Sequence, residues 1–356
     1  MPSVEDGGVE KNFYLVSNYL STKLKNVSII TTNKSIRNNL SKKINLIGPS
    51  STIWNTDSRY PKYLICLIYL FFFLLQNKNT LILSFQANAY ASLLAKILGI
   101  KIITRSNASS EGWSKSILKK ILYKIFLKIP NQIIVNSYQF KKELNIRFGV
   151  KASVIYNPLN KNSIIKKSKE KVSLKFFKGK FTKIITIGRL VNQKDHLTML
   201  KAINLIKDDN IKLLIIGDGQ NKSKLVRYIN KNELSSKVKI LPFKKNPYKY
   251  LILSDIFLFT SVFEGLPNVL LEAQCLKKFI ISTNCPTGPK EILLNGSAGD
   301  IVPMLDHKKI SEKIRSYNIK KKSYKRKILL GYKSLERFDY NNNMQKYLKI
   351  INKFIY

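Results

Sequence analysis

The segment Lys183-Ile-Ile-Thr-Ile-Gly-Arg-Leu-Val-Asn-Gln-Lys-Asp195 decides the fold of this chain. Its β-branched run predicts a strand that ends at Gly188, and Asp195 is a favourable N-cap for a following helix. This order leaves Arg189 and Lys194 at the carboxyl end of the strand, the edge where ligands bind in open α/β sheets. Two cations at that edge can neutralise the charge that develops on an anionic leaving group.

The strand and helix pattern recurs along the C-terminal half. Leu213-Leu-Ile-Ile-Gly-Asp-Gly219 predicts a second strand that ends in a glycine-rich turn at Gly217, with a helix from about Lys222. Further strands are expected at 238–243, 254–261 and 279–284. Strands that alternate with helical segments indicate a doubly wound parallel sheet.

Two glutamates stand in the segment Ser261-Val-Phe-Glu-Gly-Leu-Pro-Asn-Val-Leu-Leu-Glu-Ala-Gln274. Pro267 suits the first turn of a helix, which leaves Glu264 in the preceding loop and Glu272 inside the helix. The backbone N–H groups at a helix N-terminus form a phosphate site. An acid at each end of this cradle predicts a ligand whose hydroxyls flank a diphosphate, such as a nucleotide sugar. Taken alone, the glutamates are better explained as a cap and a solvated side chain, and the neighbouring motifs reverse that preference.

Taken together and in order, these motifs and the loop Cys285-Pro-Thr-Gly-Pro-Lys-Glu291 resemble the retaining GT-B glycosyltransferases of family 4. The resemblance extends from about Lys183 to about Leu305, and more loosely over the N-terminal half. The loop at Cys285 is similar to that of the branch that builds bacterial surface polysaccharides and lipid-linked glycans.

The resemblance implies an α/β GT-B architecture, with two Rossmann-like doubly wound parallel-sheet domains that face a central cleft. We expect an N-terminal acceptor-binding domain at 1–159, a linker at 160–180 and a nucleotide-sugar-binding domain at 181–340. A C-terminal helix at 341–356 is expected to pack back across the domains.

The resemblance also assigns roles to residues of the C-terminal half. Arg189 and Lys194 would bind the donor diphosphate, Glu272 the ribose hydroxyls and Glu264 the transferred sugar, so that Glu264, Arg189 and Lys194 form the catalytic set. The full donor-binding set is Gly188, Arg189, Lys194, Gly217, Phe243, Glu264, Gly265, Leu266, Pro267, Asn268, Val269 and Glu272.

In the N-terminal half, Gly7 and Gly8 are similar to the first glycine loop of the family, and an ordinary N-terminal turn is the alternative. The family's glycine loop follows a strand, but residues 1–6 make a poor strand, so we expect the native protein to begin roughly ten residues upstream of Met1. Many relatives carry a histidine that faces the transferred sugar. The matching segment offers Arg105, Ser106 and Asn107 instead, and Asn107 can hydrogen-bond a sugar hydroxyl.

The resemblance implies a hexosyltransferase. It would transfer a hexose or N-acetylhexosamine from a nucleotide-diphosphate donor, expected to be a UDP-sugar, to a lipid-linked or polysaccharide acceptor with retention of configuration. No cofactor or metal is expected, because Arg189 and Lys194 supply the positive charge and no Asp-x-Asp motif is present. A GT-B sugar-nucleotide epimerase or phosphorylase is the alternative, and a basic nucleic-acid-binding protein is a remote one.

The formal net charge of +42 favours an anionic partner surface. The segment from Lys115 to Lys128 has lysines on one side of a predicted helix and apolar residues on the other, so it is either a membrane-surface helix or an ordinary packed helix. We expect a cytoplasmic protein at the inner face of the membrane. The apolar run 63–75 is too short to span a bilayer, which takes roughly twenty residues, and a buried helix is preferred there over a membrane-dipping segment.

Cys66, Cys275 and Cys285 have no metal spacing, which suits a reducing compartment.

Overall fold

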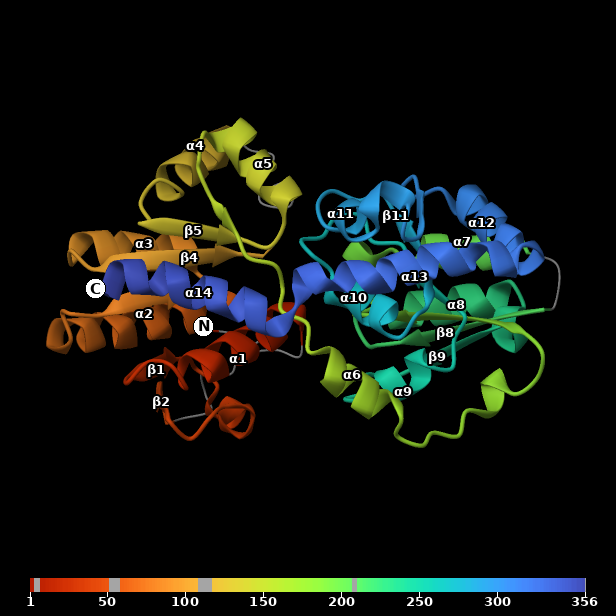
Figure 1. Cartoon of the computed structure of the whole chain (residues 1–356), viewed down its shortest axis with the longest axis horizontal. Helices are drawn as coiled ribbons and strands as arrows, with labels where there is room; N and C mark the ends of the chain where they lie inside the picture. Colours follow the sequence, from red (N-terminus) through yellow and green to blue (C-terminus); the bar gives the residue numbers. More distant parts are fainter. Residues whose placement is uncertain (3–6, 51–57, 108–116, 207–209, 356) are drawn as a thin grey trace. The chain divides into compact units, whose positions relative to one another are not determined.

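The computed structural model describes residues 1–2, 7–50, 58–107, 117–206 and 210–355 (Figure 1). The chain divides into two units, one formed by Met1–Pro158 with Tyr340–Tyr356 and the other by Leu159–Asp339. Each unit combines parallel strands with helices, the arrangement of a Rossmann-like α/β domain. Within the described residues, no helix is long and apolar enough to cross a membrane.

The first unit holds two parallel sheets in its described residues. One pairs β1 with β2, and the other has the order β3-β4-β5-β6. Their bounds are β1 Val27–Ile30, β2 Ile44–Ile47, β3 Leu81–Ser84, β4 Lys101–Ser106, β5 Gln132–Val135 and β6 Ser153–Val154. The amine of Met1 donates to the carbonyl oxygen of Ile30 at 2.8 Å. The expectation of a further strand before Gly7 stays a prediction.

Alternation along the strands gives this unit a core on each face of the sheet. Ile103 of β4 and Ile134 of β5 pack in one cluster with residues of α1 and α14. Their neighbours Ile102 and Ile133 belong to the clusters of the opposite face, because successive side chains of a strand point to opposite sides. The helices are α1 Gly8–Leu20, α2 Arg59–Gln76, α3 Asn88–Ile97, α4 Ile117–Phe126, α5 Tyr138–Phe148 and α14 Tyr340–Ile355.

The second unit is built on a six-stranded parallel sheet with the order β12-β11-β10-β7-β8-β9. The chain runs outward from β7 to β9 and then returns to β10 on the other side of β7, so the sheet is doubly wound. The switch in direction lies between β7 and β10, and ligands bind at such switch points. The bounds are β7 Thr182–Ile187, β8 Ile211–Ile216, β9 Val238–Leu241, β10 Ile256–Phe259, β11 Phe279–Thr283 and β12 Asp300–Val302.

Helices cover the sheet of the second unit, and its core includes Ile184, Leu213, Met199 and Ile310, all fully buried. The strands are rich in β-branched residues and leucine, as expected when helices cover both faces of a sheet, because strands buried on both faces are apolar throughout. The helices are α6 Lys161–Ser168, α7 His196–Asn204, α8 Lys222–Lys231, α9 Tyr248–Leu251, α10 Asn268–Cys275, α11 Pro289–Ile292, α12 His307–Ile319 and α13 Lys325–Lys333.

One expectation about a segment role needs correction. The stretch predicted as a linker at 160–180 contains α6 and belongs to the second unit, because the buried side chains of Ile164 and Phe177 anchor it there. The closing helix α14 follows the second unit in the chain but belongs to the first unit, where Met344 and Tyr347 enter the cluster that includes Val16 of α1.

The apolar run at 63–75 also differs from its expectation as a buried helix. It lies in α2, and the buried positions of this helix are Cys66 and Leu74. Leu64 and Phe72 are 64% and 59% exposed. Only one side of α2 packs against β3 and its neighbours, so its remaining apolar side chains lie on the outside of the unit.

Candidate active site at the switch point of the second unit

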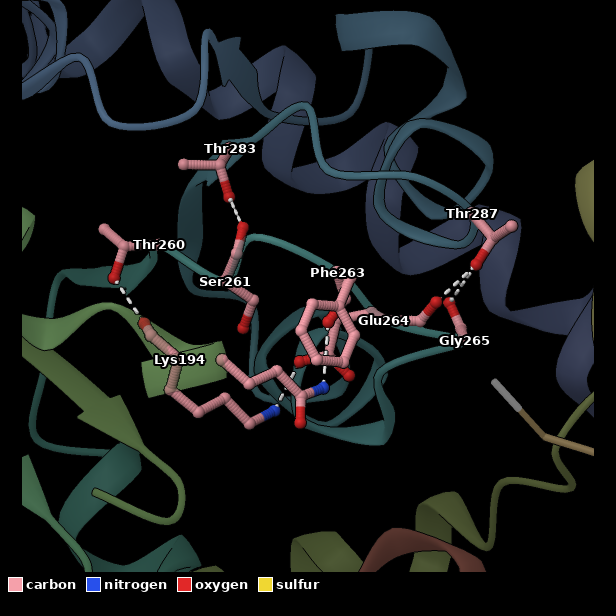
Figure 2. Close-up of polar contacts among 9 residues, drawn as sticks. Lys194, Thr260, Ser261, Phe263, Glu264, Gly265, Thr283 and Thr287 are labelled. Carbon is pink, nitrogen blue, oxygen red and sulfur yellow. Dashed lines mark hydrogen bonds and ion pairs between the residues drawn. The ribbon is translucent and has the colours of Figure 1, made fainter. Parts of the chain in front are cut away.

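Lys194 and Glu264 meet at the switch point, after the carboxyl ends of β7 and β10. The ammonium of Lys194 donates to Oε1 of Glu264 at 2.5 Å (Figure 2). Glu264 is 9% exposed, and the Lys194 nitrogen also lies 5.4 Å from the ring centroid of Phe259. The pair is therefore shielded from most solvent, which strengthens its attraction and makes either charge costly to leave alone.

Backbone and side-chain hydrogen bonds join the loops that carry these two residues. The N–H of Val262 donates to the carbonyl of Gln193 at 2.9 Å, and the Gln193 side-chain amide donates to the carbonyl of Phe263 at 2.8 Å. The Thr260 hydroxyl donates to the carbonyl of Lys194 at 2.9 Å. The loop after β7 and the loop after β10 thus form one rigid framework, which sets the position of the ion pair.

A third loop, after β11, supports Glu264 from the other side. The Thr287 hydroxyl donates to the carbonyl of Glu264 at 2.6 Å and lies 3.3 Å from that of Gly265 (Figure 2). Gly288 has a φ of +75°, and a Cβ there would overlap the carbonyl oxygen of Gly265. Glycine is therefore required at this position by both conformation and space.

Helix α10 follows this framework and carries Glu272. The helix begins at Asn268, and Pro267 precedes it with an extended ψ of 109°, so Pro267 lies just outside the first turn where it was expected. Glu272 is 5% exposed and accepts a hydrogen bond of 3.1 Å from the hydroxyl of Tyr248. The two predicted glutamates therefore lie on either side of the N-terminus of α10, each held by a partner from another element.

The ends of β7, β8 and β9 complete this edge of the sheet. A Cβ on Gly217 would overlap the carbonyl oxygen of Gly188, so the two turns pass very close to each other. Asp218 accepts the backbone N–H of Phe243 at 2.6 Å and the ammonium of Lys222 at 2.7 Å. The hydrogen bond from Lys222 and then that from the Phe243 backbone lower the pKa of Asp218.

Exposure separates the members of the predicted donor set. The ring of Phe243 is 52% exposed and the Arg189 side chain is also exposed, whereas Gly265, Leu266 and Pro267 are buried. Asn268 and Val269 are half-buried at the start of α10. The exposed members can contact a ligand directly, and the buried ones shape the backbone beneath it.

Sequence reasoning missed Tyr248, Asp218 and Thr287 as supports of the site. Their contacts join residues 24, 25 and 23 positions apart, and such pairing leaves no periodic signal in the sequence. His196 is the first residue of α7, and burial with the nearby Lys194 charge lowers its pKa to about 4.

In the first unit, the sugar-facing candidates Gly7, Gly8 and Asn107 lie at the N-terminus of α1 and directly after β4. Gly7 is the N-cap residue of α1. Oδ1 of Asn107 accepts a 2.9 Å hydrogen bond from Nε of Arg105. Arg105 is fully buried, also donates to Asn157 at 2.6 Å, and has its pKa lowered to about 9 by desolvation. It therefore orients Asn107 rather than meeting a ligand.

No group of three or more His, Cys, Asp or Glu side chains in the described part of the chain is arranged to hold a metal ion.

Comparisons with known proteins agree with this geometry. Residues 167–333, which include every switch-point residue named above, match the family described as glycosyl transferases group 1. An uncharacterized glycosyltransferase of Methanocaldococcus jannaschii is 34% identical over 237 residues, 61% of this chain and 58% of that relative. The chain thus spans a little over half the length of this relative.

A second relative has a named activity. The Campylobacter jejuni N-acetylgalactosamine-N,N'-diacetylbacillosaminyl-diphospho-undecaprenol 4-alpha-N-acetylgalactosaminyltransferase is 28% identical over 272 residues, 73% of each chain. Among solved structures, the Anabaena HepE protein in complex with UDP superposes with a TM-score of 0.79 at 15% identity, covering 99% of this chain and 98% of that one. A glycosyltransferase of Rickettsia africae gives 0.78 at 19% identity and covers 100% and 97%. The chain therefore has the GT-B fold, and its residues 167–333 resemble the glycosyl transferases group 1, including relatives that act on lipid-linked glycans.

Proposed function

We propose that this protein transfers a hexose or N-acetylhexosamine from a UDP-sugar to a lipid-linked or polysaccharide acceptor, with retention of configuration. The observation that carries the proposal is the ion pair of Lys194 and Glu264 at the switch point, next to the N-terminus of α10 and the buried Glu272. This arrangement offers a cation, amide donors and carboxylates to one ligand, as a nucleotide sugar requires.

Each residue has a proposed task. Lys194 and the exposed Arg189 neutralise the charge that develops on the departing diphosphate, with the α10 N-terminus as a further electrostatic support. Glu272, fixed by Tyr248, accepts hydrogen bonds from the ribose hydroxyls. Glu264 holds the transferred sugar, and the ring of Phe243 lies against the base. A donor that displaces Glu264 from Lys194 would exchange one ion pair for another.

The relatives support the donor and acceptor classes. The name of the Campylobacter jejuni relative specifies an N-acetylgalactosamine transfer onto a diphospho-undecaprenol-linked glycan, and the Anabaena structure was solved with UDP. A lipid-linked acceptor would bring this protein to the inner face of the cytoplasmic membrane. Among the lysines of the basic segment 115–128, Lys124 and Lys128 are exposed and are proposed to contact anionic lipid headgroups. The side chains of Lys115, Lys119 and Lys120 lie outside the description.

A donor screen tests the proposal. The full chain is incubated with UDP-, GDP- and other nucleotide sugars plus membrane extract, and nucleotide release and glycan products are followed for the parent and for Glu272→Ala. We expect release from one donor class, a transfer product, and loss of both in the variant. Epimerised or phosphorylated free sugar would instead identify a GT-B epimerase or phosphorylase. Binding to duplex DNA, with no release from any donor, would favour the nucleic-acid alternative.

A further inference from the structure

Exposed apolar side chains gather on α2, α3 and α4 of the first unit. The exposed fractions of Leu64, Phe72 and Ile97 are 64%, 59% and 71%. The whole set, named here the apolar face, consists of Tyr60, Leu64, Ile68, Phe72 and Leu75 of α2, Tyr90, Leu93 and Ile97 of α3, and Ile121, Leu122 and Ile125 of α4. Scattered exposed leucines are ordinary, but a contiguous group of this size marks an interaction surface.

The three helices lie side by side, so the apolar face is continuous. α2 contacts α3, and α3 contacts α4. The rings of Tyr63 and Tyr90 also lie 6.4 Å apart between α2 and α3.

The apolar face is separate from the core. The α2 positions Tyr60, Leu64, Ile68 and Phe72 recur every four residues, which places them in one stripe of the helix. Leu74 of α2 and Ala91 and Ala95 of α3 are buried against β3 and β4. The sheet therefore already has its covering layer, and the exposed stripes form a second apolar surface that the described residues leave open.

The charge around the apolar face has one sign. Residues 58–110 and 112–142 contain no aspartate or glutamate, so α2, α3 and α4 carry no acid. Arg59, Lys78, Lys96, Lys124 and Lys128 are exposed at the ends of these helices or just beyond them. Apolar side chains bordered by cations, with no acid among them, form the pattern of helices that lie in the interface of an anionic membrane.

We propose that the apolar face docks the protein on an anionic bilayer, with Leu64, Phe72 and Ile97 entering the acyl boundary and the surrounding lysines and arginine contacting headgroups. This deepens the proposed function and rests on it in one respect: a lipid-linked acceptor lies at that surface. It adds apolar insertion by three helices to the electrostatic contact proposed for Lys124 and Lys128.

A second copy of the chain would also cover an apolar face, but the charge argues against it. Two faces that each carry only cations would repel when paired, in a protein whose formal net charge is already +42. An anionic bilayer satisfies both the apolar side chains and the cations around them.

The test is vesicle flotation of the full chain, without nucleotide sugar, on neutral phosphatidylcholine vesicles and on vesicles that contain phosphatidylglycerol. The variant is Leu64→Gln with Phe72→Gln and Ile97→Gln. The matched control is Leu305→Gln with Ile319→Gln and Leu329→Gln, which are 63%, 80% and 51% exposed in the second unit. Circular dichroism and calorimetric titration with UDP verify that each variant folds.

We expect the parent and the control to float with anionic vesicles, and the apolar-face variant to lose at least tenfold in vesicle affinity. A residual part of the parent's binding should survive high salt, because the apolar contribution is not screened. Binding of the variant equal to that of the parent would overturn the proposal, as would no binding of the parent. A parent dimer that the variant dissociates, without vesicle binding, would assign the face to a second copy. The flotation assay contains no nucleotide sugar, so each of these outcomes can be interpreted even if the donor screen detects no transfer.

Discussion

The hydroxyl of Tyr248 donates a 3.1 Å hydrogen bond to Oε1 of Glu272, and both side chains are buried in the second unit. Tyr248 opens α9, which follows β9, and Glu272 lies in the middle of α10. The bond therefore fixes the orientation of Glu272, the residue proposed to bind the ribose hydroxyls. It comes from α9, which none of the sequence motifs included.

We expect Tyr248→Phe to weaken binding of UDP by about tenfold or more, because a hydrogen bond to a charged acceptor contributes about 1.5–3 kcal/mol. Calorimetric titration measures this directly. Tyr250→Phe, in the same helix, is the matched control and should bind UDP like the parent. Equal affinity of the parent and Tyr248→Phe would mean that Glu272 does not depend on this bond.

The Lys194 and Glu264 pair predicts a coupled effect. Lys194→Ala should lower kcat by about 10²–10³, as for other preorganised charge stabilisers. Each single alanine variant leaves a largely buried partner charge, so the double variant should lose less stability than the sum of the singles. Urea unfolding of the four proteins measures the coupling. Strict additivity, or full activity of both Lys194→Ala and Arg189→Ala, would refute the assigned site.

Two glycines allow the steric effect of a close backbone contact to be separated from the cost of a positive φ. Gly288 and Gly296 have φ values of +75° and +98°, but a Cβ would overlap Gly265 only at Gly288 and meets nothing within 4 Å at Gly296. Gly288→Ala should therefore lower both the melting temperature and donor turnover, because it pushes the loop of Glu264 away. Gly296→Ala should cost about 1 kcal/mol of stability and leave turnover intact. Similar turnover in both variants would contradict this reasoning.

His196 predicts a pH dependence of stability. Its folded-state pKa of about 4 lies below the usual 6.5, chiefly because burial disfavours the charged imidazole. The unfolded chain then binds more protons between these pH values, so stability should fall as pH is lowered from 6.5 to 4, by up to roughly 3 kcal/mol. Urea titrations compare the parent with His196→Leu, which should show a shallower slope. Met199→Leu in the same helix should keep the parent slope, and a parent-like slope in His196→Leu would disprove the assignment.

Transfer is expected to proceed without a metal, because Arg189 and Lys194 provide the positive charge that a divalent ion would supply. Nucleotide release should therefore be unchanged by excess EDTA and by later addition of Mg²⁺ or Mn²⁺. A loss of turnover in EDTA that Mg²⁺ or Mn²⁺ restores would show that the two cations do not suffice.

The sequence predicted the strands of both units closely, since each is a short β-branched or leucine-rich run bounded by turn residues. It also indicated that Arg189, Lys194, Glu264 and Glu272 lie at one sheet edge, because parallel strands present their carboxyl ends together. The expectations of a linker at 160–180 and of a buried helix at α2 were wrong, because composition does not show which apolar side chains become buried against another element.

By itself the sequence determined the alternation of strands and helices, the switch-point motifs and the strong positive charge. Only the tertiary structure decided that Lys194 pairs with Glu264, that Tyr248 fixes Glu272 and that Thr287 supports the loop between them. It also decided that α2 presents Leu64 and Phe72 to the outside. The reason is that periodicity is a local property of the chain. A hydrogen bond between distant residues, and the burial of one helix face over another, depend on how the elements pack.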